Sequence, residues 1–432
     1  MHHLREQLLS HELVLRYKVS VSDFTRNRKQ SFHSTIVFML NFLTKSLSAE
    51  IVSFVSFIRD KIEGKQVPLF SKSAFVQCRQ KIQPEVFKYL SDSLVEEFYT
   101  DNDASVKRWN GFRLLAVDGS RLTLPDTVEL ATLYGKTRNQ SDNGVVQGRF
   151  SVLYDVLNRF VIDGCLSPLS VGEGTLAYEH LSFVKQGDLI LYDRGYPSFG
   201  LVYEHFARGV DFLIRVKTDF SNVVKDFYQS GLSTDVVTIR PGKNVNLSDR
   251  SYSRDDSTEV RLVRVELSTG EVEILMTSLF DVERYSNSLF KELYFLRWGV
   301  ETFYDEVKNK MNIEYFSGYS AHSILQDFYA TLFVSNVQSL LVGELNDELA
   351  QKSKDNKYQY KVNTNLSYGF LKDRIITLFL SNQEMSDIIE ELKQLFKIDK
   401  VPIRPNRKVE RNVRKYSKRE KPKCFKNKKN AI

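Results

Sequence analysis

Two short, continuously apolar runs that each end in an aspartate constrain the fold of this 432-residue chain more than any other feature. The run FRLLAVDG ends at Asp118, and DLILYD carries Asp193 at its end. Uninterrupted apolar runs of this length indicate strands that are buried on both faces, as in the parallel sheets of α/β proteins. We therefore predict an α/β fold with two carboxylates placed at the ends of buried strands.

The segments around these two runs give an order of strands and helices. GRFSVLYDV and RFVIDGCLS predict a pair of strands joined at Leu157 and Asn158. Helices are expected near 176–185 and over 198–207, with a strand at DFLIRV. Further on, VVTIRPGKNVNLS and TEVRLVRVELSTGEVEILMTSL alternate apolar and polar residues, which predicts antiparallel strands inserted before the next helix.

That next helix is expected in KELYFLRWGVETFYDEVKNKM, which carries Tyr294, Arg297, Glu301 and Lys308. At roughly 100° per residue, these four positions share an arc of roughly 60° on one helix face. The spacing therefore predicts one functional face on which a carboxylate lies between cations. Asp305 falls on the same face and competes with Glu301 for the role of the third acid.

The Tyr-Arg-Glu-Lys spacing and the two upstream aspartates resemble the signature of the DDE transposases of bacterial insertion sequences, IS-four type. The resemblance implies a ribonuclease-H-like catalytic core interrupted by a β-rich insertion, with helical N-terminal and C-terminal regions. It implies cut-and-paste transposition through phosphodiester hydrolysis and strand transfer at terminal inverted repeats. In that fold the first and fourth strands lie side by side, so Asp118 and Asp193 are expected to meet.

Chemistry explains why such an enzyme needs three acids. Two divalent ions activate the attacking oxygen and stabilise the leaving oxygen of the phosphodiester. Mg²⁺ prefers oxygen ligands, so Asp118, Asp193 and Glu301 are the expected catalytic and metal-binding residues, with two Mg²⁺ ions that Mn²⁺ can replace. The seven histidines are scattered without zinc-type spacing, which argues against a zinc enzyme.

The cations and the tyrosine of the signature are expected to contact DNA. Arg297 can bind a phosphate with both arms of its guanidinium, and Lys308 supplies a point charge to the backbone. By resemblance, Tyr294 donates its hydroxyl to a phosphate near the cleaved end. Arg194 is assigned to DNA contact as well. For Asp193, the alternative to a catalytic role is a salt bridge with Arg194 or a helix cap before Pro197.

Several other interpretations stay open at this point. Asp118 can be a turn residue before Gly119, and Arg297 and Glu301 can form an ordinary i, i+4 pair on an exposed helix. At the level of function, the alternatives are a metal-dependent nuclease of the same fold without strand transfer and a decayed relic that only binds DNA. A carboxylate-pair glycosidase is disfavoured because cations beside the acid suit phosphate better than sugar.

The domain organisation follows from these patterns and from helical periodicity at both ends. We expect a helical N-terminal DNA-binding region at 1–105, the core at 106–216 and 281–318, the insertion at 217–280, a helical region at 319–398 and a basic tail at 399–432. Within the first region, a helix capped by Ser71 or Ser73 precedes another opened by Pro84. Such a pair can expose Gln77, Arg79, Gln80 and Lys81 to DNA as a helix-turn-helix variant, or it can be an ordinary packed hairpin.

Charge and composition set the remaining expectations. Residues 401–432 hold thirteen Lys or Arg against two Glu, a net charge of +11. Because the whole chain has a net charge of +7, residues 1–400 together carry 7 − 11 = −4. Such a tail either binds DNA by releasing counterions or is a disordered end without a partner. Three distant cysteines imply no disulfides, and the longest apolar stretch is about half a membrane span. We expect a cytoplasmic, nucleoid-associated bacterial protein that binds double-stranded DNA, both inverted repeats and target, as a homodimer in a synaptic complex without membrane contact.

Overall fold

The computed structural model describes residues 1–404 apart from 27, 42, 66, 102–104, 138–143, 244, 246, 248–250 and 268. Most of the basic tail therefore lies outside the described residues. The chain divides into two compact units, which we describe separately. The first unit contains residues 1–106, 122–148 and 305 onward, and the second contains Lys107–Arg121 and Arg149–Tyr304.

The first unit is mainly helical, as the periodicity of both chain ends predicts. Helix α13, one of the longest, packs against α6, α3, α14 and α16. Ser71 caps α5 through its hydroxyl, as predicted. The elements of this unit are α1 (His2–Leu9), α2 (His11–Tyr17), α3 (Phe32–Leu40), α4 (Leu47–Lys61), α5 (Lys72–Arg79), α6 (Glu85–Asp101), α7 (Val128–Tyr134), β2 (Lys136–Thr137), α13 (Ala321–Lys352), β10 (Tyr360–Val362), α14 (Thr364–Leu371), α15 (Arg374–Leu380), α16 (Met385–Ile398) and β11 (Lys400–Pro402).

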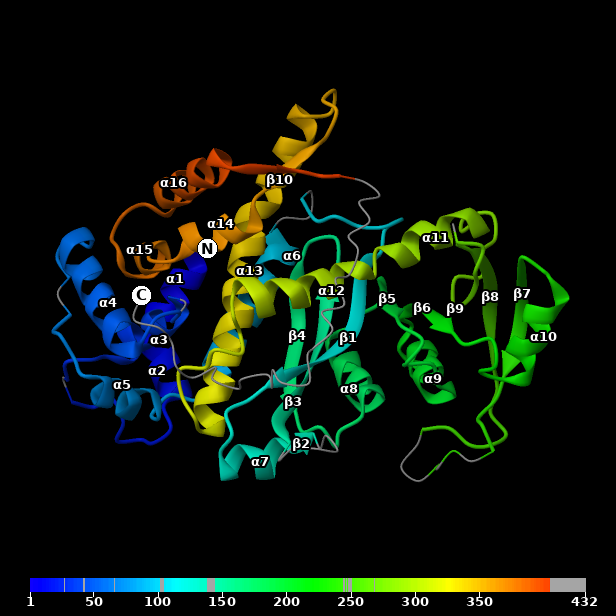
Figure 1. The fold of residues 1–432 in the computed structure, drawn as a ribbon, viewed down its shortest axis with the longest axis horizontal. Coiled ribbons are helices and arrows are strands. Elements are labelled where there is room, and N and C mark those ends of the chain that lie inside the picture. Colours follow the sequence, from blue (N-terminus) through cyan, green and yellow to red (C-terminus); the bar gives the residue numbers. More distant parts are fainter. Residues whose placement is uncertain are drawn as a thin grey trace, which may run out of the picture. The chain divides into compact units, whose positions relative to one another are not determined.

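The second unit is built on a mixed sheet, so the predicted α/β class is confirmed (Figure 1). Its strands run in the order β3-β1-β5-β6-β9-β8-β7, and β4 pairs with β3 on the other side. Strands β1 and β3 continue into residues of the first unit. The elements are β1 (Arg113–Thr123), β3 (Val145–Asp155), β4 (Phe160–Ser167), α8 (Glu173–His180), β5 (Asp188–Tyr192), α9 (Phe199–Arg208), β6 (Asp211–Val216), α10 (Asn222–Ser230), β7 (Thr234–Ile239), β8 (Thr258–Glu266) and β9 (Val272–Thr277).

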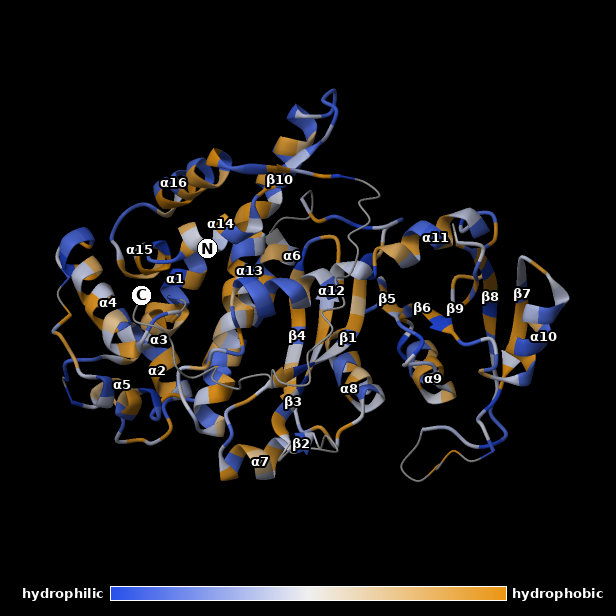
Figure 2. Ribbon diagram, in the orientation of Figure 1, coloured by the Kyte–Doolittle hydropathy of each residue, from blue (hydrophilic) through white to orange (hydrophobic). Residues whose placement is uncertain are grey.

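Strands β1 and β5 lie side by side and parallel, as the order of elements predicts. Ala116 pairs with Leu191, and the same register continued by two residues sets Asp118 level with Asp193. Residues 114–117 of β1 and 189–192 of β5 are fully buried, which explains their apolar character. Figure 2 shows the hydrophobic colour of these central strands.

The strands after β6 form one sheet with the core. Strand β9 pairs antiparallel with β6, and β8 and β7 follow it outward. The alternating segments are therefore strands, as predicted, and they extend the central sheet directly. None of the described helices combines the length and the hydrophobicity that a bilayer crossing requires.

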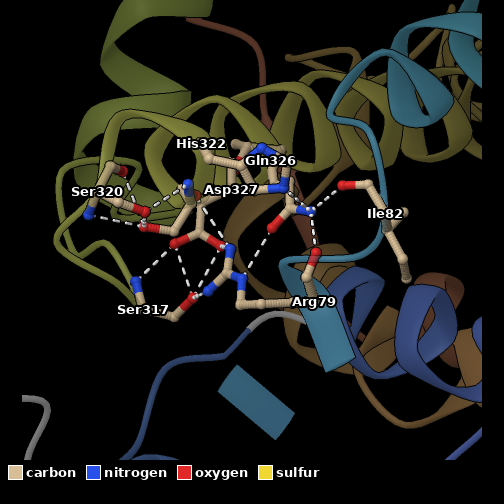
Figure 3. Close-up of polar contacts among 9 residues, drawn as sticks. Arg79, Ile82, Ser317, Ser320, His322, Gln326 and Asp327 are labelled. Atoms are coloured by element: carbon tan, nitrogen blue, oxygen red, sulfur yellow. Dashed lines mark hydrogen bonds and ion pairs between the residues drawn. The ribbon is translucent and has the colours of Figure 1, made fainter. Parts of the chain in front are cut away.

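The prediction that Arg79, at the end of α5, is exposed to DNA is wrong. Its side chain is only 2% exposed and is held inside the first unit by residues around the start of α13 (Figure 3). The guanidinium donates to Asp327 Oδ1 at 2.8 Å, to Gln326 Oε1 at 2.8 Å and to Ser317 Oγ at 2.6 Å. Arg79 therefore joins α5 to a segment about 240 residues later in the chain.

Replacing Arg79 with Ala leaves the Asp327 carboxylate without its main cationic partner. Because breaking a buried ion pair from one side leaves an uncompensated charge, we expect a loss of about 3 kcal/mol in the free energy of unfolding. Urea unfolding followed by circular dichroism measures it. Arg59→Ala, which removes an exposed pair with Asp60, is the matched control and should change stability by less than about 0.5 kcal/mol.

Candidate active site

Two strands of the second unit position the two aspartates. Asp193 comes directly after β5, as the sequence predicts. Asp118 lies inside β1, which continues to Thr123, so the prediction that a strand ends there is wrong and the turn interpretation falls with it. Most of the residues after Asp118 are half-buried or exposed and yet stay in the strand, which the apolar run alone does not reveal.

The surroundings of Asp118 fix its main chain and desolvate its carboxylate. The Gly119 amide donates to its Oδ1 at 2.8 Å, and the Tyr304 hydroxyl donates to its main-chain oxygen at 2.7 Å. Burial raises the pKa of Asp118 to about 6, against the opposing effects of the Gly119 amide and Arg297. A methyl group on Gly119 would lie 3.1 Å from Glu173 Cγ, so the Glu173 side chain would have to move by a few tenths of an ångström to make room for it.

The segment with the Tyr-Arg-Glu-Lys spacing consists of three helical pieces, so the prediction of one regular helix face is wrong. They are α11 (Asn287–Phe295), α12 (Trp298–Asp305) and a π-helical turn (Glu306–Lys310). Between α11 and α12 the Arg297 amide bonds to the Tyr294 carbonyl, three residues back instead of four. A rotation of 100° per residue therefore does not hold through the whole segment.

Arg297 bridges two of the three predicted acids. Its Nη2 donates to Glu301 Oε1 at 2.7 Å, and its Nη1 lies 3.8 Å from Asp118 Oδ2. The residue is only 5% exposed, which rules out an ordinary pair on an exposed helix. Tyr294 and Trp298 place their rings within 6 Å of the guanidinium, so aromatic faces add to its stabilisation.

Tyr294 links the same group to the second aspartate. Its hydroxyl donates to Asp193 Oδ1 at 3.3 Å, and its ring is buried. Five of the predicted residues, Asp118, Asp193, Tyr294, Arg297 and Glu301, thus form one connected network within the second unit, which we call the carboxylate cluster. They come from β1, the residue after β5, α11, the break between α11 and α12, and α12 itself.

The structure also describes the three other residues that the sequence singles out. Lys308 lies in the π-helical turn and belongs to the first unit, where burial lowers its pKa. Asp305, the competitor for the third acid, is exposed and accepts a hydrogen bond from Asn309 Nδ2 at 2.7 Å. Arg194 is exposed next to Asp193, and no salt bridge joins these two described residues.

Sequence patterns did not predict the groups that contact the main chain of Asp118. Ser151 Oγ lies 3.4 Å from the Asp118 carbonyl oxygen and 2.9 Å from His180 Nε2, and His180 Nδ1 lies 2.7 Å from Asp163 Oδ2. All three of these side chains are buried, so this is a positioning relay and no hydrolytic triad. Tyr304 could have been found from the sequence, because it lies one helical turn after Glu301. Ser151, His180 and Asp163 could not, because their positions in the sequence follow no regular spacing.

The cluster offers several carboxylate oxygens as metal ligands, but the guanidinium of Arg297 already contacts two of its three carboxylates. Within the described residues, no three His, Cys, Asp or Glu side chains are grouped as a ready metal site. The Arg297 guanidinium stands instead between Asp118 and Glu301. The donor set of three carboxylates nevertheless suits a hard divalent ion, and three acids against one arginine leave a charge of about −2 to be compensated.

The raised pKa of Asp118 makes a prediction about stability. A carboxyl whose pKa is about 6 in the folded state and 3.8 when unfolded stabilises the fold below pH 3.8, and that contribution is lost as the pH rises through 6. Asp118→Asn should therefore raise the free energy of unfolding by up to about 3 kcal/mol at pH 7.5, but not at pH 3.8.

Denaturant unfolding in EDTA at both pH values measures the effect. Asp226→Asn, which changes an exposed carboxylate on α10, is the matched control and should show no comparable gain. Equal stability of Asp118→Asn and the unmodified chain at pH 7.5 would contradict the burial argument.

Comparisons with known proteins identify the family to which this sequence is similar. Residues 109–337 match the family described as "Transposase DDE domain". The Transposase InsG for insertion sequence element IS4 of Escherichia coli is 22% identical over 245 residues, which span 56% of this chain and 54% of that protein. The transposase for insertion sequence element IS231F of Bacillus thuringiensis is 20% identical over 372 residues, 76% of this chain and 73% of that protein.

Among solved structures, a piggyBac transposase synaptic complex with hairpin DNA aligns with 91% of this chain and 84% of its own, at 10% identity and a TM-score of 0.42. The matched region covers about half the length of the Escherichia coli relative. The resemblance to the transposases of insertion sequences is thus confirmed. Because the matched domain accounts for 337 − 109 + 1 = 229 of the 432 residues, more than half, the chain belongs to the DDE transposase family.

Proposed function

We propose that this chain is a transposase that excises an insertion sequence and inserts it elsewhere by cutting and joining DNA strands at terminal inverted repeats. The observation that carries the proposal is the carboxylate cluster, in which one buried arginine contacts Asp118 and Glu301 and the neighbouring Tyr294 contacts Asp193. In this proposal the protein acts as a homodimer in a synaptic complex with double-stranded DNA, in the cytoplasm at the nucleoid of a bacterium.

Divalent metal ions are general cofactors of this family. We propose two Mg²⁺ ions, replaceable by Mn²⁺, held by Asp118, Asp193 and Glu301. The oxygen-only donor set and the residual charge of about −2 support this assignment. The ions would activate the attacking oxygen and stabilise the leaving oxygen of the phosphodiester.

The protein's own side chains orient the DNA in this proposal. Arg297 is held against Glu301 and Asp118 and can turn its guanidinium to a phosphate once these acids take metal. Tyr294, now on Asp193, can donate its hydroxyl to a phosphate near the cleaved end. Lys308 and the exposed Arg194 are proposed contacts to the DNA backbone.

Glu301→Gln tests the catalytic assignment. The substitution keeps the size of the side chain but removes a negative charge, so metal-dependent nicking should fall by about a thousandfold or more. The substrate is a plasmid carrying the gene with its natural flanks, incubated with Mg²⁺ and with Mn²⁺. Glu292→Gln on α11 changes an exposed carboxylate and should cut as the unmodified chain does.

The same assay separates the alternatives. Metal-dependent cuts without joined products would favour a nuclease, and DNA binding without any cut would favour a decayed relic. Cuts that persist in Glu301→Gln would overturn the assignment of the third acid.

The tail is tested separately by a truncation after Arg404, which keeps β11 intact. The removed segment holds twelve Lys or Arg and two Glu. If these cations neutralise phosphates, the slope of log affinity against log salt should become shallower by about 0.9 for each lost contact. Fluorescence anisotropy at several salt concentrations measures it, and an unchanged slope would show that the tail does not contact DNA.

A further inference from the structure

Tyr304 connects the strand of the first acid with the helix of the third acid. It is buried on α12, one helical turn after Glu301. Its hydroxyl donates to the Asp118 main-chain oxygen at 2.7 Å and lies 3.2 Å from the main-chain oxygen of Phe150 on β3. Its ring packs at a right angle on the Phe150 ring, with centroids 5.0 Å apart. The ring and the hydroxyl are therefore both fixed, and they join α12 to β1 and β3.

The Tyr304 hydroxyl is the main side-chain donor to the Asp118 oxygen. An O–H···O hydrogen bond is ordinarily about 2.5–3.0 Å long. The 2.7 Å contact from Tyr304 is therefore a full hydrogen bond, whereas the 3.4 Å contact from Ser151 is a weak one. The Ser151 hydroxyl also lies 2.9 Å from His180 Nε2, a second partner for the same group. Burial raises the pKa of Tyr304 well above its usual value, so the hydroxyl keeps its proton and stays a donor.

One peptide group carries the effect of this bond to the Asp118 carboxylate. The peptide between Asp118 and Gly119 is planar and trans, so its C=O and N–H point in opposite directions. Its oxygen accepts the Tyr304 hydroxyl, and its N–H, which belongs to Gly119, donates to Asp118 Oδ1 at 2.8 Å. Because the group is rigid, a fixed oxygen also fixes the direction of the amide. The amide in turn holds Oδ1 in place.

The other carboxylate oxygen of Asp118 belongs to the carboxylate cluster. Oδ2 lies 3.8 Å from Nη1 of Arg297, whose Nη2 donates to Glu301. The two oxygens thus have different partners, a main-chain amide for Oδ1 and the cation between the acids for Oδ2. A carboxylate that turned about its Cβ–Cγ bond would exchange them. Because Mg²⁺ demands near-ideal octahedral geometry from its oxygen ligands, such a rotation would weaken metal binding by Asp118.

We propose that Tyr304 is a positioning residue for DNA cleavage. Its hydroxyl fixes the peptide group between Asp118 and Gly119 and so orients the Asp118 carboxylate for metal binding, without touching metal or DNA itself. Because Tyr304 and Glu301 lie on the same helix, the bond also sets the distance between the first and third acids. The inference rests on the proposed function in that Asp118 and Glu301 are taken as metal ligands.

Tyr304→Phe tests this role, because it removes the hydroxyl and keeps the ring that packs on Phe150. Mn²⁺ binding to the full chain, followed by electron paramagnetic resonance of the free ion, measures the effect without turnover. Loss of a group that orients a metal ligand weakens metal binding by roughly tenfold or more, so Kd for Mn²⁺ should rise about tenfold. Titrations with and without a duplex already cut at the end of the element cover the DNA-bound and the free protein.

Nicking of the plasmid that carries the gene and its flanks separates chemistry from DNA binding. With Mg²⁺, the rate constant of Tyr304→Phe at saturating DNA should fall by about tenfold. The DNA concentration that gives half of the maximal rate should stay within about twofold of its original value, because no group assigned to DNA contact has changed. A rise in this concentration with an unchanged rate constant would contradict the positioning role.

Thr277→Val is the matched control for the loss of a buried hydroxyl. Thr277 is fully buried on β9, two strands from β5, and its hydroxyl donates to the Phe212 main-chain oxygen at 2.6 Å. Each substitution removes one buried bond from a hydroxyl to a carbonyl, so both should lower Tm by about 1–3 °C. Only Tyr304→Phe should also weaken Mn²⁺ binding and slow nicking. Equal losses in both variants would show that lower stability, and not lost positioning, explains them.

The outcomes separate this inference from the proposed function. Unchanged Mn²⁺ binding and nicking in Tyr304→Phe, when the unmodified chain binds the ion and cuts DNA, overturns the positioning role and leaves the transposase proposal standing. An unmodified chain that neither binds Mn²⁺ nor nicks DNA contradicts both. Weaker Mn²⁺ binding in Tyr304→Phe, with an unmodified chain that binds DNA but never cuts it, supports the positioning role and contradicts the transposase proposal.

Discussion

The parallel pairing of β1 with β5 is the contact on which the carboxylate cluster depends. Neighbouring strands are about 4.8 Å apart, so a register that sets Asp118 level with Asp193 brings the two carboxylates together from residues 75 positions apart in sequence. A slip of one residue would turn Asp118 to the opposite face of the sheet. The fully buried residues 114–117 and 189–192 make such a slip costly, because it would displace the whole core.

Arg297 gives the cluster its electrostatic character. Three acids close together repel one another, and burial adds a cost for each charge that is removed from water. A guanidinium placed between Asp118 and Glu301 reduces both effects, and it does so from a break between two helices. The third acid, Asp193, accepts a hydrogen bond from the Tyr294 hydroxyl, so a neutral donor and not the arginine contacts this carboxylate.

The parts of the fold that follow from local pattern could be predicted from the sequence. Apolar runs located β1 and β5, and alternation located β8 and β9. The break after Phe295 could not be predicted, because the segment around it has continuous helical periodicity and no proline. Arg79 and the relay of Ser151, His180 and Asp163 also escaped prediction, because their partners come from distant positions that only the folded chain brings together.

The pairing of β9 with β6 changes how the inserted segment should be regarded. A module joined by flexible linkers can be removed or exchanged without effect on its host, but these strands cover the edge of the core sheet. Without them, β6 would present a bare row of amide and carbonyl groups, which is a template for association with other chains. During synthesis the core therefore stays prone to aggregation until the chain has been made as far as Thr277.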